Sequence, residues 1–159
     1  MIRIANAPCS WGALEFDLQG KPATFDIVLD EMQKTGYAGT ELGDWGFMPT
    51  EPAALKKELA KRSLKLLGAF VPVALKDETT HKAGEEAALK VARLLSGVEG
   101  ASPFIVLADN NGSIPERTQN AGRVTASMGL SDAEWKTFAR GAERIARALK
   151  KETGMRLVF

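Results

Sequence analysis

Short apolar runs alternate with longer segments of helical periodicity along this chain, and the alternation constrains the fold more than any other feature. A helix repeats its buried residues at spacings of three and four, whereas a buried strand is a short apolar run bounded by Gly or Pro. Five runs are predicted to be strands, at 2–7, 38–42, 64–71, 103–108 and 155–159. Four segments are predicted to be helices, at 24–35, from 50 onward, at 78–96 and at 131–154.

Local signals sharpen these boundaries. Thr50 is expected to cap the second helix, and Pro72 to end the third strand. Ser131 and Glu134 have the spacing of a capping box at the start of the last helix. Two apolar stripes are expected to face the core, namely Ala87, Val91, Leu94 and Leu95 in the third helix and Trp135, Phe138, Ala142, Ile145 and Leu149 in the last.

The order of these segments predicts an α/β fold with a parallel sheet, because right-handed crossovers join strands that alternate with helices. No G-x-G-x-x-G turn follows the first strand, which weakens a doubly wound nucleotide-binding sheet. A (β/α) barrel usually needs about 250 residues, and this chain has 159. We therefore expect a TIM-barrel fragment of about four βα units plus a fifth strand, occupying 1–159 as one unit. A self-contained flavodoxin-like domain is the alternative.

Composition excludes several functional classes. The 21 Lys and Arg residues balance 20 Asp and Glu residues, and no basic cluster suggests nucleic-acid binding. A hydrophobic fraction of 45% is typical of a folded domain. The single cysteine, Cys9, excludes an internal disulfide framework and is consistent with a reducing compartment. No apolar run has the length of a membrane span or a secretory leader, so we expect a cytoplasmic protein without membrane contact.

Four passages carry a resemblance to a known family: 6–12 (NAPCSWG), 36–43 (GYAGTELG), 67–72 (LGAFVP), and 121–123 (AGR) followed by 129–131 (GLS). Together they resemble the xylose isomerase-like TIM barrels, the sugar isomerase/epimerase superfamily, and within it the inosose dehydratase group. The resemblance implies a sugar or polyol isomerase, epimerase or dehydratase, with its active site at the C-terminal mouth of the barrel. It also implies a divalent metal, Mn, Co, Mg or Zn, held by ligands from strands five to eight. This sequence ends within strand five, so the resemblance implies an N-terminal half that binds no metal by itself and is inactive alone.

Residues that follow the predicted strands are the candidate site residues, because chemistry in a barrel lies at the C-terminal ends of its strands. Glu41 ends the second strand and is the candidate acid/base, with a structural acceptor for backbone amides as the alternative. Trp11 could stack on a sugar ring or simply plug the barrel mouth. The candidate substrate-binding residues are Asn6, Ser10, Trp11, Asp109, Asn110 and Arg123.

Other features are given more ordinary interpretations. Asp109, Asn110 and Asn111 are good turn formers, and the polar 109–130 segment is either a lid carrying Arg117 and Arg123 or a solvated loop. His81 has no Cys, second His or carboxylate at a spacing that would complete a metal shell, and no His lies near Cys9 in the sequence, so we assign neither residue a role. The charged run 56–62 is expected to be a solvated helix face.

A sheet of five parallel strands leaves two edges with unpaired backbone groups. We therefore expect a partner to cover them, either the remaining half of the barrel or a second copy in a homodimer. The first functional hypothesis is the N-terminal part of a metal-dependent sugar or polyol enzyme. The second is a noncatalytic half-barrel that serves in assembly or in binding a small molecule.

Overall fold

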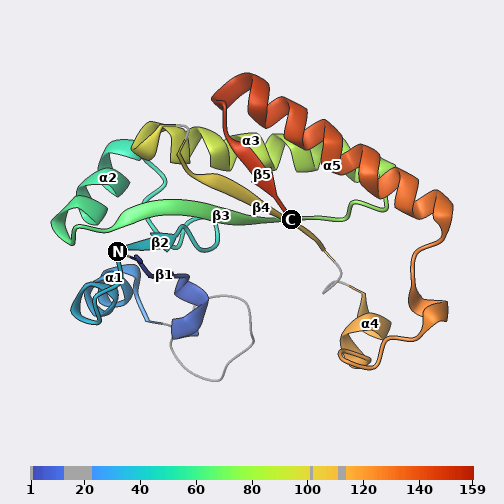
Figure 1. Cartoon of the computed structure of the whole chain (residues 1–159), viewed down its shortest axis with the longest axis horizontal. Coiled ribbons are helices and arrows are strands. Elements are labelled where there is room, and N and C mark those ends of the chain that lie inside the picture. Colours follow the sequence, from blue (N-terminus) through green and yellow to red (C-terminus); the bar gives the residue numbers. More distant parts are fainter. Residues whose placement is uncertain (1, 13–22, 101, 111–113) are drawn as a thin grey trace.

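The computed structural model describes residues 2–12, 23–100, 102–110 and 114–159. Strands and helices alternate along it as the sequence predicts (Figure 1). In chain order the elements are β1 (Ala5–Asn6), the 3-10 helix η1 (Pro8–Trp11), α1 (Phe25–Lys34), β2 (Gly39–Glu41), α2 (Pro52–Lys61), β3 (Lys65–Val73), η2 (Glu78–Thr80), α3 (His81–Glu99), β4 (Phe104–Asp109), α4 (Pro115–Gln119), η4 (Ala126–Met128), α5 (Asp132–Thr153) and β5 (Arg156–Val158).

The five strands form one sheet in the order β1-β2-β3-β4-β5, and every neighbouring pair is parallel. Sequential order with parallel pairing is the arrangement of consecutive units in a (β/α) barrel, whereas a doubly wound sheet changes direction within its strand order. The C-terminal ends of all the strands consequently lie along one edge. The prediction of a single parallel sheet is confirmed.

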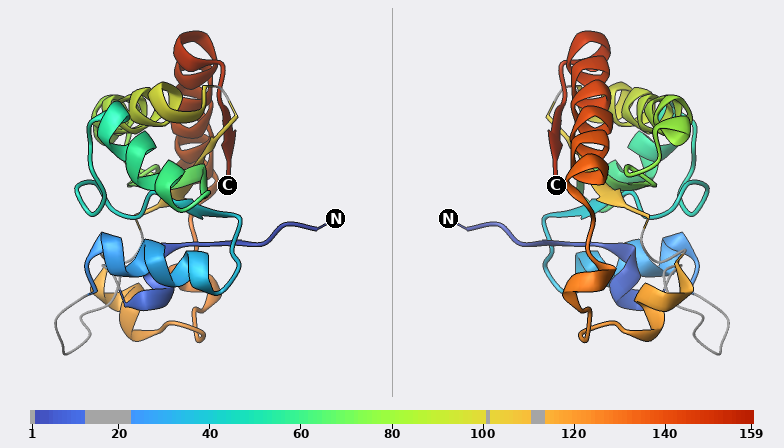
Figure 2. Two further views of the ribbon diagram at one scale, coloured as in Figure 1. Left: turned by 90° about the vertical axis from the view of Figure 1, so that its left-hand side faces the viewer. Right: turned by 90° about the vertical axis from the view of Figure 1, so that its right-hand side faces the viewer.

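Helices α2, α3 and α5 cover the outer side of this sheet (Figure 2). Helix α3 packs on β3, β4 and α5, helix α2 packs on β3, and α5 packs on β5. The core lies between the two layers, where Leu66, Val71, Ile105 and Leu107 of the sheet are buried. The side chains that alternate with them, including Leu67, Phe70 and Val158, are 37–39% exposed on the other face. Among the residues that the structure describes, the sheet is therefore packed on one face and open on the other.

The predicted capping box at α5 is present. The hydroxyl of Ser131 accepts from the Glu134 amide, and the Glu134 carboxylate accepts from the Ser131 amide at 2.7 Å. At α2 the cap is Glu51, which accepts from the Ala54 amide at 2.9 Å, so the prediction of Thr50 was one residue early.

The predicted first and third strands differ from the observed ones. Strand β1 comprises two residues only, and Ile2 and Ile4 are exposed because β1 has one partner strand and an uncovered inner face. Strand β3 continues through Pro72 to Val73. Pairing of β2 with β3 ends at Gly68, so Pro72 lies where β3 has only β4 beside it and the missing amide hydrogen is tolerated.

Three side-chain predictions were wrong. Ala87 is exposed, because α3 packs on both the sheet and α5 and buries Gly84, Ala88 and Ala92 instead. Trp135 is exposed on α5 and contacts only the edge of Phe138 at 5.4 Å among the aromatic pairs described. Arg62 is not solvated, since its side chain is 10% exposed and bridges Asp30 and Glu58.

Candidate functional site

Glu41 lies at the C-terminal end of β2, where the pairing with β3 shifts register. Thr40 pairs with Leu66, but Glu41 pairs with Gly68, so one residue of β3 is skipped. A β-bulge of this kind re-aims the side chains beside it. At Gly68 a Cβ atom would lie 2.6 Å from the carbonyl oxygen of Phe104, so only glycine fits between β2 and β4 here.

Two adjoining hollows are lined by Glu41. The larger, of about 250 Å³, opens on the uncovered face and is bounded by Ala5, Asn6, Ala7, Glu41, Leu67 and Phe104. The smaller, of about 70 Å³, is bounded by Ala7, Pro8, Cys9, Glu41, Gly43, Asp44 and Phe70. A half-buried carboxylate between apolar walls and an amide side chain is an arrangement that can bind hydroxyl groups or exchange a proton.

Asn6 shares the larger hollow with Glu41, as expected from strand ends that meet at one edge. Its Oδ1 accepts from the Ala7 amide at 2.9 Å and from the Ser10 hydroxyl at 2.8 Å, and its Nδ2 donates to the Tyr37 hydroxyl at 3.2 Å. These bonds fix the orientation of the amide group. Ser10 is thereby held next to Asn6, although it does not line either Glu41 hollow.

Trp11 is directed toward α1. Its indole Nε1 donates to the Glu31 carboxylate at 2.6 Å, and its ring meets Tyr37 edge-on at 6.3 Å between centroids. Neither Glu41 hollow is lined by Trp11. The indole therefore joins η1 to α1, and its role toward substrate stays a prediction.

Asp109 ends β4 and Asn110 follows it, on the same edge of the sheet. Together they bind the end of β3 and the loop after it. Oδ1 of Asp109 accepts from the Leu75 amide at 3.3 Å, and the Asn110 amide donates to the Val73 carbonyl at 3.0 Å. Asn111 lies outside the described residues. The structure thus does not place these side chains on the Glu41 hollows, and their role in binding substrate stays a prediction.

The described part of the segment that follows β4 is not a plain loop, since it contains α4 and η4. It lies beyond the C-terminal ends of the strands (Figure 1). Arg123 is exposed there, and its guanidinium donates to the Gln119 carbonyl at 3.3 Å. Arg123 is not among the residues that line either Glu41 hollow. Its reach toward a substrate stays a prediction.

Sequence reasoning missed the apolar walls of these hollows and the position of Cys9. Leu67 lies within β3 and Phe104 begins β4, and no polar residue at a strand's C-terminal end marks either of them as a site residue. Their alternation with buried neighbours was a usable signal, because it places them on the face opposite the helices.

The described residues do not form a metal centre. Within the described ranges, no group of three or more His, Cys, Asp and Glu side chains is placed to hold an ion. His81, the only histidine, is buried at the start of α3 and not at the Glu41 hollows. None of the helices described is long and apolar enough to cross a membrane.

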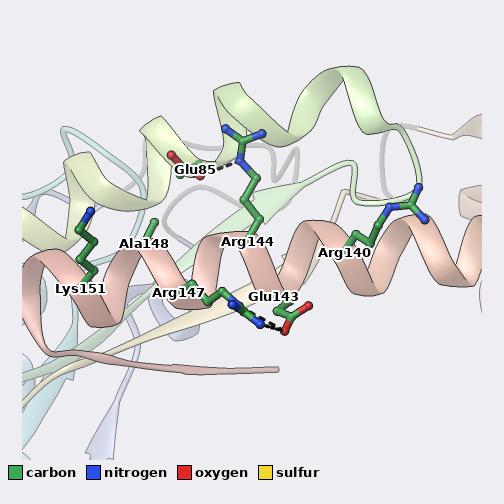
Figure 3. A pocket seen from close by; sticks show the side chains of 7 residues that line it. All are labelled: Glu85, Arg140, Glu143, Arg144, Arg147, Ala148 and Lys151. Carbon is green, nitrogen blue, oxygen red and sulfur yellow. Dashed lines mark hydrogen bonds and ion pairs between the residues drawn. The ribbon is translucent and has the colours of Figure 1, made fainter.

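A third hollow, of about 480 Å³, lies on the outer layer where α3 and α5 meet (Figure 3). Arg144 donates to Glu85 at 2.7 Å, and Arg147 donates to Glu143 at 2.6 Å. Because these cations are paired with acids and exposed to solvent, the hollow is a surface of ion pairs. We do not assign it chemistry.

No family model matches the chain. It is 27% identical to the inosose dehydratase of Clostridium perfringens and 29% identical to that of Lacticaseibacillus casei, in each case over 158 residues, which is 99% of this chain and 51% of the relative. The chain spans about half the length of the curated relatives it matches.

A solved structure supports the same interpretation of the fold. The probable 3-DHS dehydratase AsbF of Bacillus anthracis superimposes with a TM-score of 0.60 at 10% identity, covering 99% of this chain and 52% of that one. The fold is therefore a TIM-barrel fragment like the matching part of AsbF, in agreement with the predicted fold class. The resemblance to the inosose dehydratases extends over the whole chain and half of the relatives.

Proposed function

We propose that this chain is the N-terminal part of a TIM-barrel dehydratase that acts on a polyhydroxylated substrate, a sugar or polyol, and that the Glu41 hollows are part of its substrate site. The observation that carries the proposal is the place of Glu41, half-buried at the C-terminal end of β2 and sharing a hollow with Asn6. The likeness to inosose dehydratases favours dehydration over isomerisation or epimerisation.

Dehydration of a hydroxyketone removes a proton from the carbon beside the carbonyl and a hydroxyl group from the next carbon, and the hydroxyl leaves as water after it takes up a proton. Glu41 suits one of these proton transfers, since a carboxylate can accept the first proton and a carboxylic acid can donate the second. The Asn6 amide, oriented by its bonds to Ala7 and Tyr37, would hold a substrate hydroxyl. The apolar walls of the hollow reduce competition from water.

The divalent metal that the resemblance implies does not fit the residues described here, because they contain no cluster of ligands for it. We place its ligands, within this proposal, in strands that the chain does not span. No step assigned to Glu41 or Asn6 depends on it. By the same reasoning we expect the chain to be inactive when alone.

The open face of the sheet leads to a proposal about the partner. Leu67 and Phe70 line the Glu41 hollows and Val158 extends the exposed apolar surface on β5. Among the described residues, β1 and β5 each pair with one strand only. We propose that the remaining strands of a barrel cover this face, with a second copy of the chain as the alternative. The same face favours the second candidate function, a noncatalytic half-barrel that serves in assembly.

Complementation tests the catalytic proposal. The chain is produced together with the C-terminal half of the Lacticaseibacillus casei inosose dehydratase, and the assembly is assayed for dehydration of inosose. We expect activity from the assembly and none from the chain alone. Glu41→Gln should lower kcat/KM by about 10² to 10⁴, the usual contribution of a general acid or base. Glu116→Gln, an exposed carboxylate on α4, is the matched control and should change nothing.

Each other outcome is informative. Activity that survives Glu41→Gln would remove the role assigned to Glu41. An assembly that sediments as one species yet does not dehydrate the substrate would overturn the catalytic proposal and favour the half-barrel module.

A further inference from the structure

His81 is buried at a place where the sequence suggested no role for it. It is 4% exposed and begins α3, and its ring nitrogen Nε2 lies 2.8 Å from the carbonyl oxygen of Leu75. A carbonyl oxygen can only accept a hydrogen bond, so Nε2 carries the hydrogen and donates. The imidazole therefore holds the loop that joins β3 to α3.

The imidazole ring packs directly on the backbone of α5 at Gly141. A Cβ atom at Gly141 would lie 2.5 Å from Nε2 and 2.8 Å from Cδ2 of His81, so a side chain there would displace the ring. Glycine within a helix is less favourable than alanine, so its presence here needs a reason. The ring of His81 fills the space that this glycine leaves, which fixes the ring between α3, α5 and the loop.

Leu75 is also hydrogen-bonded to the end of β4. Its amide hydrogen is shared between the Val73 carbonyl at 2.8 Å and Oδ1 of Asp109 at 3.3 Å, and its side chain is fully buried. The same residue thus receives a bond from His81 and gives one to Asp109. Because Asp109 ends β4, the contact lies on the edge of the sheet where Glu41 also ends its strand.

Neighbouring bonds stiffen the rest of the loop. The Thr80 hydroxyl donates to the Ala74 carbonyl at 2.9 Å, and the Asp77 carboxylate accepts from the amide and the hydroxyl of Thr79. Those two bonds hold the pKa of Asp77 below its ordinary value. His81 is the buried member of this set, so it connects the loop to the helix layer.

We propose that His81 is a positioning residue for the C-terminal rim of the sheet, and that it acts through Leu75 on the carboxylate of Asp109. Any effect of His81 on catalysis rests on the proposed function, because it requires a dehydratase site at this rim. The structural effect of His81 on Leu75 and Asp109 does not depend on that site. It also explains why Asp109 is turned toward the loop and away from the Glu41 hollows.

Amide hydrogen exchange of the 159-residue chain, followed residue by residue by NMR, tests this proposal. His81→Leu removes the donor to the Leu75 carbonyl and so loosens the loop. We expect the Leu75 amide, which itself donates to Val73 and Asp109, to exchange about tenfold faster because local opening becomes easier by about the free energy of one hydrogen bond. Exchange at Leu29 in α1 should stay unchanged. His81→Gln restores an N–H donor and should return Leu75 to within threefold of the parent chain.

Two further variants separate positioning from a general loss of stability. Asp109→Ala should also speed exchange at Leu75, and its effect should fall when His81→Leu is already present, because both act on one residue. Glu41→Gln should leave Leu75 unaffected, so a failed dehydratase assay does not bear on this result. If His81→Leu does not fold, Gly141→Ala displaces the ring from the outside and should give the same local change.

A uniform rise in exchange at Leu75 and Leu29 in His81→Leu would reduce His81 to an ordinary core residue and overturn the proposal. So would unchanged exchange at Leu75, or a failure of His81→Gln to restore it.

Discussion

The two faces of the sheet have opposite environments although they belong to the same strands. On the helix side, Leu66, Ile105 and Leu107 are almost fully buried. On the inner side, Leu67 and Phe70 are 37% and 39% exposed. Apolar surface is buried at a gain of about 25 cal/mol per Å², so the outer face contributes stability to this chain and the inner face contributes little.

The helices and the outer face of the sheet form a buried core between them. In this layer α3 and α5 pack on each other as well as on the strands. The inner face carries the Glu41 hollows and lacks such a cover in the described part of the chain. The side chains that stabilise the chain and those that line the candidate site therefore lie on opposite faces of one sheet. Substitutions on one face can thus change stability without changing the site.

The largest effect is expected from matched leucines on β3 and β4. Leu107→Ala should lower the free energy of unfolding by about 2–5 kcal/mol, since it leaves a cavity in the packed layer. Leu67→Ala should cost less than about 1 kcal/mol, because its side chain is already in partial contact with water. Urea denaturation of both variants measures the difference. Equal costs would show that the inner face is covered in solution.

An intermediate effect is expected at Gly68, where the packed and open faces meet at the bulge beside Glu41. Gly68→Ala places a methyl group 2.6 Å from a backbone oxygen of β4, so the strands must separate. We expect a loss of about 1–3 kcal/mol, typical of overpacking, together with shifted NMR signals at Glu41. Signals that move only around α3 would mean that the close approach does not govern the site.

The smallest effect is expected at the cap of α5, on the solvated rim of the helix layer. Hydrogen bonds from the Ser131 amide and hydroxyl hold the pKa of Glu134 below its ordinary value. A lowered pKa in the folded state means that the unfolded chain binds the proton first. The stabilisation is therefore present above the ordinary pKa and is lost as the pH falls through the folded value.

Glu134→Gln should remove this contribution. Urea midpoints of the parent and the variant should differ at pH 7 and converge as the pH is lowered toward 3. A difference that stays constant with pH would assign the effect to packing of the side chain instead of its charge.

The order of elements could be predicted because periodicity and turn residues are local properties. The capping box at Ser131 needs only four consecutive residues, and the structure contains it. Glu41 was singled out because strand ends meet at one edge in a parallel sheet, and it does share a hollow with Asn6. These predictions required no knowledge of which helix packs on which strand.

Other features depend on residues that are distant along the chain. Trp11 was predicted either to stack on substrate or to plug the barrel mouth, and the structure shows its indole bound to Glu31 and in contact with Tyr37. Its role toward substrate stays a prediction. His81 was given no role, because the sequence does not show that its ring meets the Leu75 carbonyl of the preceding loop and Gly141 of the distant α5.

The sequence by itself determined the alternation of strands and helices, the parallel sheet and the candidate carboxylate at a strand end, since each follows from hydrophobic spacing and chain order. Only the tertiary structure decided which aromatic and polar side chains face the hollow and which are used to join one element to another. The physical reason is that a hydrogen bond or a ring contact forms between whichever groups packing brings within reach. The spacing of residues along the chain does not give the distances between those groups.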